Sequence, residues 1–375
     1  MKFTKYCFLF YFFLISSSWG DETSYSLNGT SNLLYGYSDV SSPYEALDKN
    51  NNYVGTVRLN SSVEHDFNDN YRFSLYFDLM AGSGLELQNY TNGSWGKEIY
   101  GVFETPFGQF VAGESLNVAA QLQAETPAYG PLGINNSSIV DFIKNPNWQR
   151  RNHGYTSFQT LNSTAMNTDG VAPKISYYSP QFVNTIFAFS YVPDTYSRTG
   201  LINKFAHYAR KDAYIAALYN ETDLGFADLV TSLGYGIYQK NDKDLTASLA
   251  LYRGNWSLGA SYRKTYVDGN DYSIAHNSQN IKLPDFFDNY REGKAWSAGV
   301  GYRFGPLKTS LSYFESQADN TRNKDEIIMF ANDFQINKYL NLYAIAAHVN
   351  FRGIDSSFYD NNKGYAFVTG FGINF

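Results

Sequence analysis

The sequence feature that most constrains the fold is a two-residue alternation, which is clearest between Tyr71 and Leu79. The apolar positions form one face: Tyr71, Phe73, Leu75, Phe77 and Leu79. The intervening positions form a second, more polar face: Arg72, Ser74, Tyr76 and Asp78. Alternation with this period is typical of a β-strand that separates an apolar from a polar environment.

Similar segments recur along the whole chain. With the segment above they give sixteen expected strands, and an even number is typical of bacterial single-chain barrels. The expected strands are Tyr25–Tyr37, Tyr53–Val63, Tyr71–Leu79, Glu98–Glu104, Gln109–Glu114, Lys174–Phe182, Thr185–Tyr191, Ala213–Asn220, Ala227–Tyr238, Asp244–Arg253, Trp256–Tyr266, Lys294–Arg303, Leu307–Ser316, Glu326–Ile336, Leu340–Phe351 and Lys363–Phe375.

The connections between these segments alternate between short and long. Tight links fall at residues 65–70, 105–108, 181–184, 221–225, 254–255, 304–306 and 337–339, and longer polar links include 81–97, 193–211 and 267–293. Short periplasmic turns and long outer loops characterise transmembrane barrels, whereas a soluble sandwich has no reason to segregate its loops. No self-similar repeat is present, which argues against a solenoid or propeller. The pattern predicts an all-β chain folded as a transmembrane antiparallel β-barrel of sixteen strands.

Composition agrees with this fold class. Aromatic residues make up 18% of the chain and charged residues only 17%, and the mean hydropathy is −0.38. This composition is too polar for a helical membrane protein and too rich in aromatic residues for an ordinary soluble protein. A transmembrane barrel accounts for both, because its strands direct apolar side chains outward and polar ones into a wet interior.

The first twenty residues have the pattern of a secretory signal peptide. Lys2 and Lys5 precede an apolar run, Tyr6–Ile15, that is too short to span a bilayer as a helix. We expect cleavage after Gly20, residues 21–375 forming the barrel; the alternative is a buried N-terminal helix. The single cysteine, Cys7, lies in this segment, which excludes a disulfide framework and Cys-ligated metal in the mature chain.

Removing the two lysines of this segment leaves 27 basic against 35 acidic residues, a net charge of −8 with histidine neutral. A net acidic chain argues against nucleic acid as a partner. It favours cation preference in a pore, although local rings of charge matter more than the total.

One long stretch, Ser115–Val171, interrupts the strands and follows no alternation. A connection of this length inside a compact domain indicates function, and among strands that close on themselves it can fold inward and narrow the lumen. We therefore predict that residues 115–171 form the constriction loop of a channel.

Charged residues in and around this loop are candidates for the constriction: Glu114, Glu125, Asp141, Arg150 and Arg151 on the loop and its base, and Arg58, Arg72 and Asp78 on the polar faces of early strands. Opposed charges across a narrow pore would set a transverse field that filters ions and orients dipolar solutes. The alternative for each residue is a charge that is merely solvated. Arg150, Arg151 and His153 could also bind lipopolysaccharide phosphate, or pair with Glu125 or Asp141.

Four segments resemble the Gram-negative general porin family: EIYGVFETPFGQFVAGESL (residues 98–116), PKISYYSPQF (173–182), WSAGVGYRFGPLKTSLSYF (296–314) and the terminal GFGINF. The resemblance implies a sixteen-stranded outer-membrane barrel that assembles as a homotrimer and passes small hydrophilic solutes and ions passively. Its expected surroundings are outer-membrane lipid and lipopolysaccharide. One departure is Gly113-Glu114, where the family often has Gly-Arg, and it puts anion preference in doubt.

No catalytic or cofactor-binding motif accompanies this pattern. The five histidines are scattered, and neither G-x-S-x-G nor H-E-x-x-H occurs. A barrel phospholipase stays open as an alternative, because catalytic triads form in space rather than in sequence. We predict a general diffusion channel without enzyme activity or cofactor. The alternatives are a substrate-selective channel, for example for sugars, and a non-conducting adhesin or structural barrel.

Overall fold

The computed structural model describes residues 23–40, 51–82, 98–135, 138–148, 150–151, 155–156, 160–194, 211–238, 242–266, 273–276, 279–282, 292–319, 321–353 and 361–375. Within these ranges nearly all regular structure is β, and no helix is long and apolar enough to cross a membrane.

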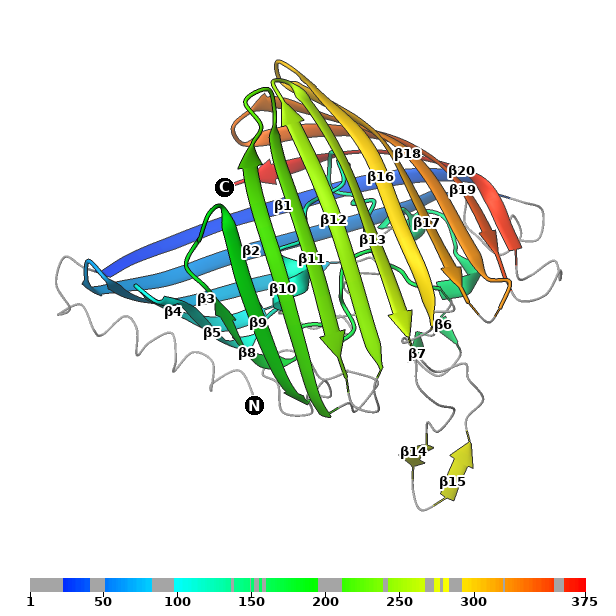
Figure 1. Ribbon diagram of the computed structural model, residues 1–375. Helices are drawn as coiled ribbons and strands as arrows, with labels where there is room; N and C mark the ends of the chain where they lie inside the picture. Colours follow the sequence, from blue (N-terminus) through cyan, green and yellow to red (C-terminus); the bar gives the residue numbers. More distant parts are fainter. Residues whose placement is uncertain are drawn as a thin grey trace, which may run out of the picture.

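Sixteen strands pair in chain order and close into one antiparallel barrel (Figure 1). They are β1 (Thr23–Val40), β2 (Asn51–Asn68), β3 (Tyr71–Gly82), β4 (Glu98–Thr105), β5 (Gly108–Glu114), β8 (Pro173–Tyr178), β9 (Thr185–Asp194), β10 (Lys211–Asp223), β11 (Asp228–Ile237), β12 (Lys243–Arg253), β13 (Trp256–Tyr266), β16 (Gly293–Phe304), β17 (Leu307–Ala318), β18 (Lys324–Asn337), β19 (Leu340–Arg352) and β20 (Asn361–Asn374). The predicted strand number and barrel are confirmed.

Two small hairpins stand apart from the wall. One pairs β6 (Arg150–Arg151) with β7 (Tyr155–Thr156), and the other pairs β14 (Ser273–His276) with β15 (Gln279–Lys282).

The expected strand ends differ from the structure by a few residues, most clearly at β8. This strand ends at Tyr178, whereas the alternation predicts a strand to Phe182. Pro180 has no N–H to donate to a ladder, and Val183 and Asn184 adopt positive φ angles of 46° and 61°. The chain therefore turns before the apolar pattern ends.

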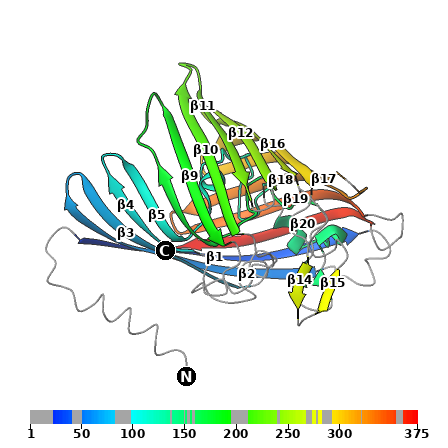
Figure 2. The ribbon, with the colours of Figure 1, turned by 60° about the horizontal axis from the view of Figure 1, so that its bottom comes forward.

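The barrel closes where the two ends of the chain meet, with β1 between β2 and β20 (Figure 2). Gly29 donates its N–H to the Phe375 carbonyl at 2.7 Å, and Phe375 donates back to Gly29 at 3.0 Å. The Phe375 ring occupies the space that a side chain at position 29 would need. The terminal aromatic thus packs on a glycine and holds the seam that leaves the barrel without a free edge.

The outer surface of the barrel is apolar. Large hydrophobic side chains alternate outward on every long strand, for example Leu249, Leu258, Leu311 and Phe330, each close to half exposed. In water such a continuous surface would aggregate, whereas a lipid bilayer covers it.

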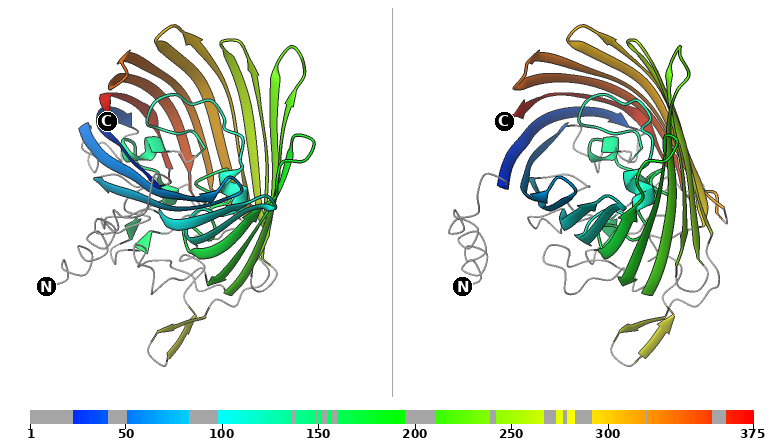
Figure 3. Two further views of the ribbon diagram at one scale, coloured as in Figure 1. Left: turned by 90° about the vertical axis from the view of Figure 1, so that its left-hand side faces the viewer. Right: turned by 60° about the vertical axis from the view of Figure 1, so that its left-hand side comes forward.

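The loop between β5 and β8 folds into the barrel, as predicted (Figure 3). It contains the short helix α4 (Val118–Gln121) and two 3₁₀ turns, η1 (Ser138–Asp141) and η2 (Pro146–Trp148). Asn117 caps α4 by accepting the Ala120 N–H at 2.9 Å.

Part of the barrel interior departs from the expected polar lining. The inward faces of β18, β19, β20 and β1 are apolar and form one buried cluster with the loop, which includes Leu34, Leu132, Ile134, Ile139, Phe142, Ile143, Ile327, Met329, Ile345, Val349, Phe351 and Val368. The physical reason is that the loop lies on these strands and excludes water, so apolar burial stabilises the contact as it does in a soluble core.

Candidate functional site

A row of serines on the inner wall binds the first half of the loop. Ala124 donates its N–H to Ser248 of β12 at 2.8 Å, and Tyr129 donates to Ser310 of β17 at 2.9 Å. Between them, the Thr126 hydroxyl lies 2.9 Å from that of Ser297 on β16. An irregular loop cannot satisfy its own backbone groups, so these hydroxyls replace the water that the loop displaces.

Glycines in the same strands allow the loop backbone to approach closely. A methyl group at Gly259 of β13 would lie 2.6 Å from the Glu125 carbonyl oxygen, and one at Gly299 of β16 would lie 2.8 Å from that of Pro127. Neither distance permits a side chain without movement of the loop backbone. Serines and glycines together therefore form a docking track across β12 to β17.

The returning half of the loop is held by buried charges. Arg263 of β13 forms an ion pair with Asp244 of β12 at 2.7 Å, and both side chains are almost fully buried. The same guanidinium donates to Asn167 at 2.5 Å and to Thr168 at 2.8 Å, both on the loop. Nearer the end of the loop, Lys174 forms a buried ion pair with Asp169 at 3.1 Å.

At its far end the loop reaches across to the first two strands. Phe142 packs on Gly36 of β1, and Asn52 of β2 donates to the Asp141 carbonyl at 2.6 Å. On the neighbouring strand β20, Asn362 donates to the Lys144 carbonyl at 2.7 Å. These contacts run from β8 around the barrel to β2. The loop also touches β4 near its base, where the Leu116 N–H donates to Glu98 at 3.4 Å, but the polar inner faces of β2 to β4 are not part of the apolar cluster or the docking track.

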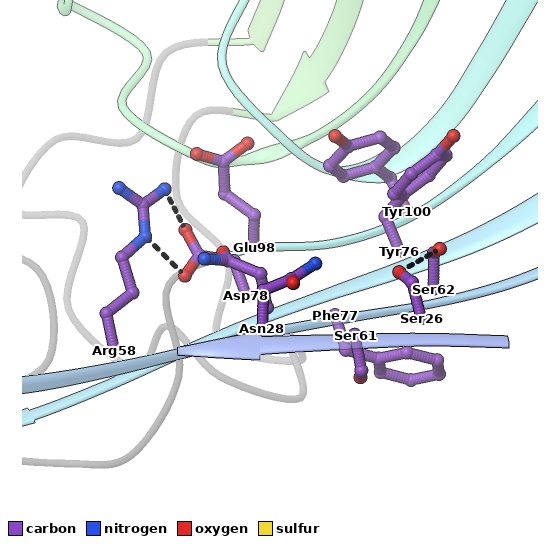
Figure 4. Close-up of a pocket in the computed structure, with 11 residues that line it drawn as sticks. Ser26, Asn28, Arg58, Ser61, Ser62, Tyr76, Phe77, Asp78, Glu98 and Tyr100 are labelled. Atoms are coloured by element: carbon purple, nitrogen blue, oxygen red, sulfur yellow. Dashed lines mark hydrogen bonds and ion pairs between the residues drawn. The ribbon is translucent and has the colours of Figure 1, made fainter. Parts of the chain in front are cut away.

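A cavity of about 290 Å³ lies against this polar wall (Figure 4). Its inward-facing lining is polar and aromatic: Ser26, Asn28, Arg58, Asn60, Ser62, Tyr76, Asp78, Glu98 and Tyr100. Ser61 and Phe77 also border it, but their side chains point to the opposite face of the sheet in Figure 4. The cavity therefore faces the lumen beside the loop.

Two of the predicted constriction residues meet in this cavity. Arg58 donates Nε to Asp78 Oδ1 at 2.8 Å and Nη2 to Oδ2 at 2.6 Å, a bidentate pair. Asp78 is directly opposite Glu98 in the β3–β4 register. Two facing carboxylates repel one another, so Arg58 stabilises the wall by neutralising one of them.

Arg72 lies elsewhere. It donates to Asp66 at 2.5 Å near the turn that joins β2 to β3, and both side chains are about half exposed. Asp78 lies six positions further along β3, which is about 20 Å along a strand. Arg72 therefore belongs to the turn end of the lumen rather than to the cavity.

The predicted loop residues occupy three different positions. Glu114 is buried at the end of β5, between Ile99 and Pro173 of the adjacent strands. Glu125 is exposed beside the docking track, and Asp141 ends η1, where its carbonyl binds Asn52. Arg150 and Arg151 form β6, and their side chains lie outside the described residues, as does His153.

Sequence reasoning missed several residues that the structure brings to the cavity and to the docking track. Glu98 and Tyr100 belong to an expected strand, but only the register shows that they lie opposite Asp78 and Tyr76. The signal for the track was present as Ser and Gly on alternate positions of β13 and β16, where small residues indicate close approach of another backbone.

A profile of the Gram-negative porin family matches residues 15–354. The chain belongs to the Gram-negative porin family. Porins are outer-membrane channels for the passive diffusion of solutes, and membership locates this barrel in a Gram-negative outer membrane and supports that function for it. The family and its fold consist of channels rather than enzymes.

Solved structures share the fold at low sequence identity. An anion-selective porin from Comamonas acidovorans is 14% identical, with a TM-score of 0.58 over 94% of this chain and 100% of that one. OmpF from Salmonella typhi, in complex with daunomycin, is 12% identical, with a TM-score of 0.63 over 95% and 98%. The trimer form of OmpT from Vibrio cholerae is 11% identical, with a TM-score of 0.59 over 95% and 100%.

A curated relative, an uncharacterised protein from Rickettsia bellii, is 30% identical over 100 residues. That match spans 27% of this chain and 20% of the relative's length.

Proposed function

We propose that this porin forms a water-filled diffusion pore along the inner faces of β1 to β4, with a preference for cations. The observation that carries the proposal is the polar wall left open by the loop. On the inward faces of β2 to β4 it bears the carboxylates Glu64, Asp66, Asp78, Glu98 and Glu104, against the guanidinium groups of Arg58 and Arg72. Five negative and two positive groups give a net wall charge of −3, which concentrates cations in the lumen.

Current through the purified protein in a planar bilayer, recorded under a salt gradient, tests this proposal. We expect open, non-rectifying conductance with a reversal potential displaced toward the Nernst potential of the cation. Absence of current through correctly folded protein would contradict the proposed pore and would favour the adhesin or structural barrel.

Neutralising the wall should lower the cation preference. The variant Glu64→Gln/Glu98→Gln/Glu104→Gln changes the net wall charge from −3 to 0, so the wall no longer favours cations and the reversal potential should move toward zero. Glu315→Gln is the matched control, because Glu315 lies on the outward face of β17. A triple variant with the reversal potential of the native protein would remove this wall from the selectivity filter.

The loop carboxylates are a second part of the proposed filter. Replacing Glu125, which is exposed, and Asp141, which is partly buried, by Gln and Asn should reduce the cation preference further, since carboxylates beside the pore add to its negative potential. The same reversal-potential measurement decides the point. Unchanged values in this double variant would assign both residues to solvated positions.

Assembly and targeting complete the proposal. We propose a homotrimer, which the sequence resemblance implies, and a signal peptide that is cut after Gly20. Native mass spectrometry in mild detergent tests both. A monomer or dimer mass, or a mature chain that retains residues 1–20, would overturn the corresponding part.

We propose that lipopolysaccharide binds to a pair of lysines on the outer surface. Lys264 of β13 and Lys294 of β16 are directly opposite one another on the lipid-facing side, above the cross-strand pair Tyr262 and Trp296. Facing lysines repel, and Asp319 pairs with only the first of them. A lipid A phosphate would neutralise the second; Lys264→Gln/Lys294→Gln should then reduce the lipopolysaccharide that copurifies.

A further inference from the structure

The pore cavity is divided into a charged half and an aromatic half. Arg58, Asp78 and Glu98 lie at one side, and the rings of Tyr76 and Tyr100 lie at the other (Figure 4). The two rings stack with their centroids 5.2 Å apart and their planes inclined by 23°. Both hydroxyl groups extend in the same direction as the Glu98 carboxylate in Figure 4.

The two tyrosines are not explained by packing of the loop. Tyr178 of β8, by contrast, donates to Gln121 of the loop. Tyr76 donates instead to Glu64 of the wall at 3.5 Å, and neither Tyr76 nor Tyr100 belongs to an apolar cluster among the described residues. Their half-buried rings border the open cavity, so they are available to a solute.

The charge of the cavity selects which solute these rings suit. Asp78 and Glu98 carry two negative charges and Arg58 one positive charge, so the lining has a net charge of −1. The face of a tyrosine ring attracts a cation through its quadrupole, and a nearby carboxylate adds a charge-assisted hydrogen bond to an ammonium group. A flat apolar group on the same solute gains additional contact with the rings.

We propose that Tyr76, Tyr100 and Glu98 form a binding site inside the pore for organic cations that carry an ammonium group and a planar ring. The ammonium lies between Glu98 and the tyrosines, and the ring of the solute packs on the exposed tyrosine surface. This site rests on the proposed pore, because the solute reaches it only through the open lumen. It makes the channel retain such cations rather than merely pass them.

Three probes of different chemistry test the site by their effect on ion current through single channels. Benzylammonium carries both features, benzyl alcohol has the ring without the charge, and methylammonium has the charge without the ring. We expect saturable block by benzylammonium at concentrations where the other two leave the current unchanged. Equal block by benzylammonium and methylammonium would show simple charge attraction and would overturn the site.

The decisive variant is Tyr76→Ser/Tyr100→Ser, since serine is already common on this inner wall. It should weaken the block by benzylammonium at least roughly tenfold, the effect of losing about 1.4 kcal/mol of ring contact. The reversal potential for inorganic salt should stay unchanged, because no charge is removed. Glu98→Gln should weaken the block and lower the cation preference together.

Tyr235→Ser is the matched control, since Tyr235 is 42% exposed on the outward face of β11. It should retain native block. Native block in the double tyrosine variant would overturn the site while leaving the pore intact. Absence of current or of cation preference in the unmodified protein would instead overturn the proposed function.

Discussion

Replacing Gly259 and Gly299 by valine is expected to lower the conductance of the channel and to add brief closures. The carbonyl oxygens of Glu125 and Pro127 occupy the space that the new side chains need. Because the barrel wall lies behind the loop, the displaced segment can move only toward the open wall of β2 to β4. The pore would narrow, and the free energy of unfolding of the protein would fall by about 1–3 kcal/mol per site.

Single-channel recording and denaturant unfolding in lipid vesicles measure the two effects. Ala260→Val also places a valine on β13, next to position 259, but on the outward face of the strand, where it meets lipid. This control should keep native conductance. If the double glycine variant conducts like the control, the docking track does not set the width of the pore.

The strands of this barrel could be predicted because their signal is local. A strand between lipid and lumen alternates at every step, as Tyr71 to Leu79 does, and no long-range information is needed to recognise it. The alternation weakens where the lumen is dry. On β18 and β19 both faces carry apolar residues, such as Ile327 and Ile328, and only the loop that covers the inner face explains the pattern.

Which side chains meet at the site could not be predicted from the sequence, because this depends on how the strands are aligned with one another. Arg58, Arg72 and Asp78 could be assigned to polar faces, but their partners depend on strand register. Asp66 is directly opposite Arg72, whereas Asp78 is a diagonal neighbour of Arg58, within reach of its long side chain. The same register places Glu98 and Tyr100 in the cavity, and a shift of one residue would have turned them toward lipid.

The ion pair between Arg263 and Asp244 is expected to be the most important single polar contact for the stability of the docked loop. Arg263→Met leaves the Asp244 carboxylate buried without its cation and removes the hydrogen bonds to Asn167 and Thr168. Breaking a buried pair from one side typically costs about 3–5 kcal/mol. Denaturant unfolding in lipid vesicles should show that the free energy of unfolding falls by this amount. Residues 160–172 should also become accessible to protease.

A double variant separates the cost of an unpaired charge from the value of the pair. Arg263→Met/Asp244→Leu removes both charges, so much of the lost stability should return even though the loop contacts are still missing. The exposed pair of Arg72 and Asp66 is the matched control. Its side chains are 44% and 46% exposed, and removing Arg72 should cost much less stability than removing Arg263, because water and salt screen an exposed pair. If the two substitutions lower the free energy of unfolding equally, the loop is held by its apolar cluster and its serine contacts and does not depend specially on Arg263.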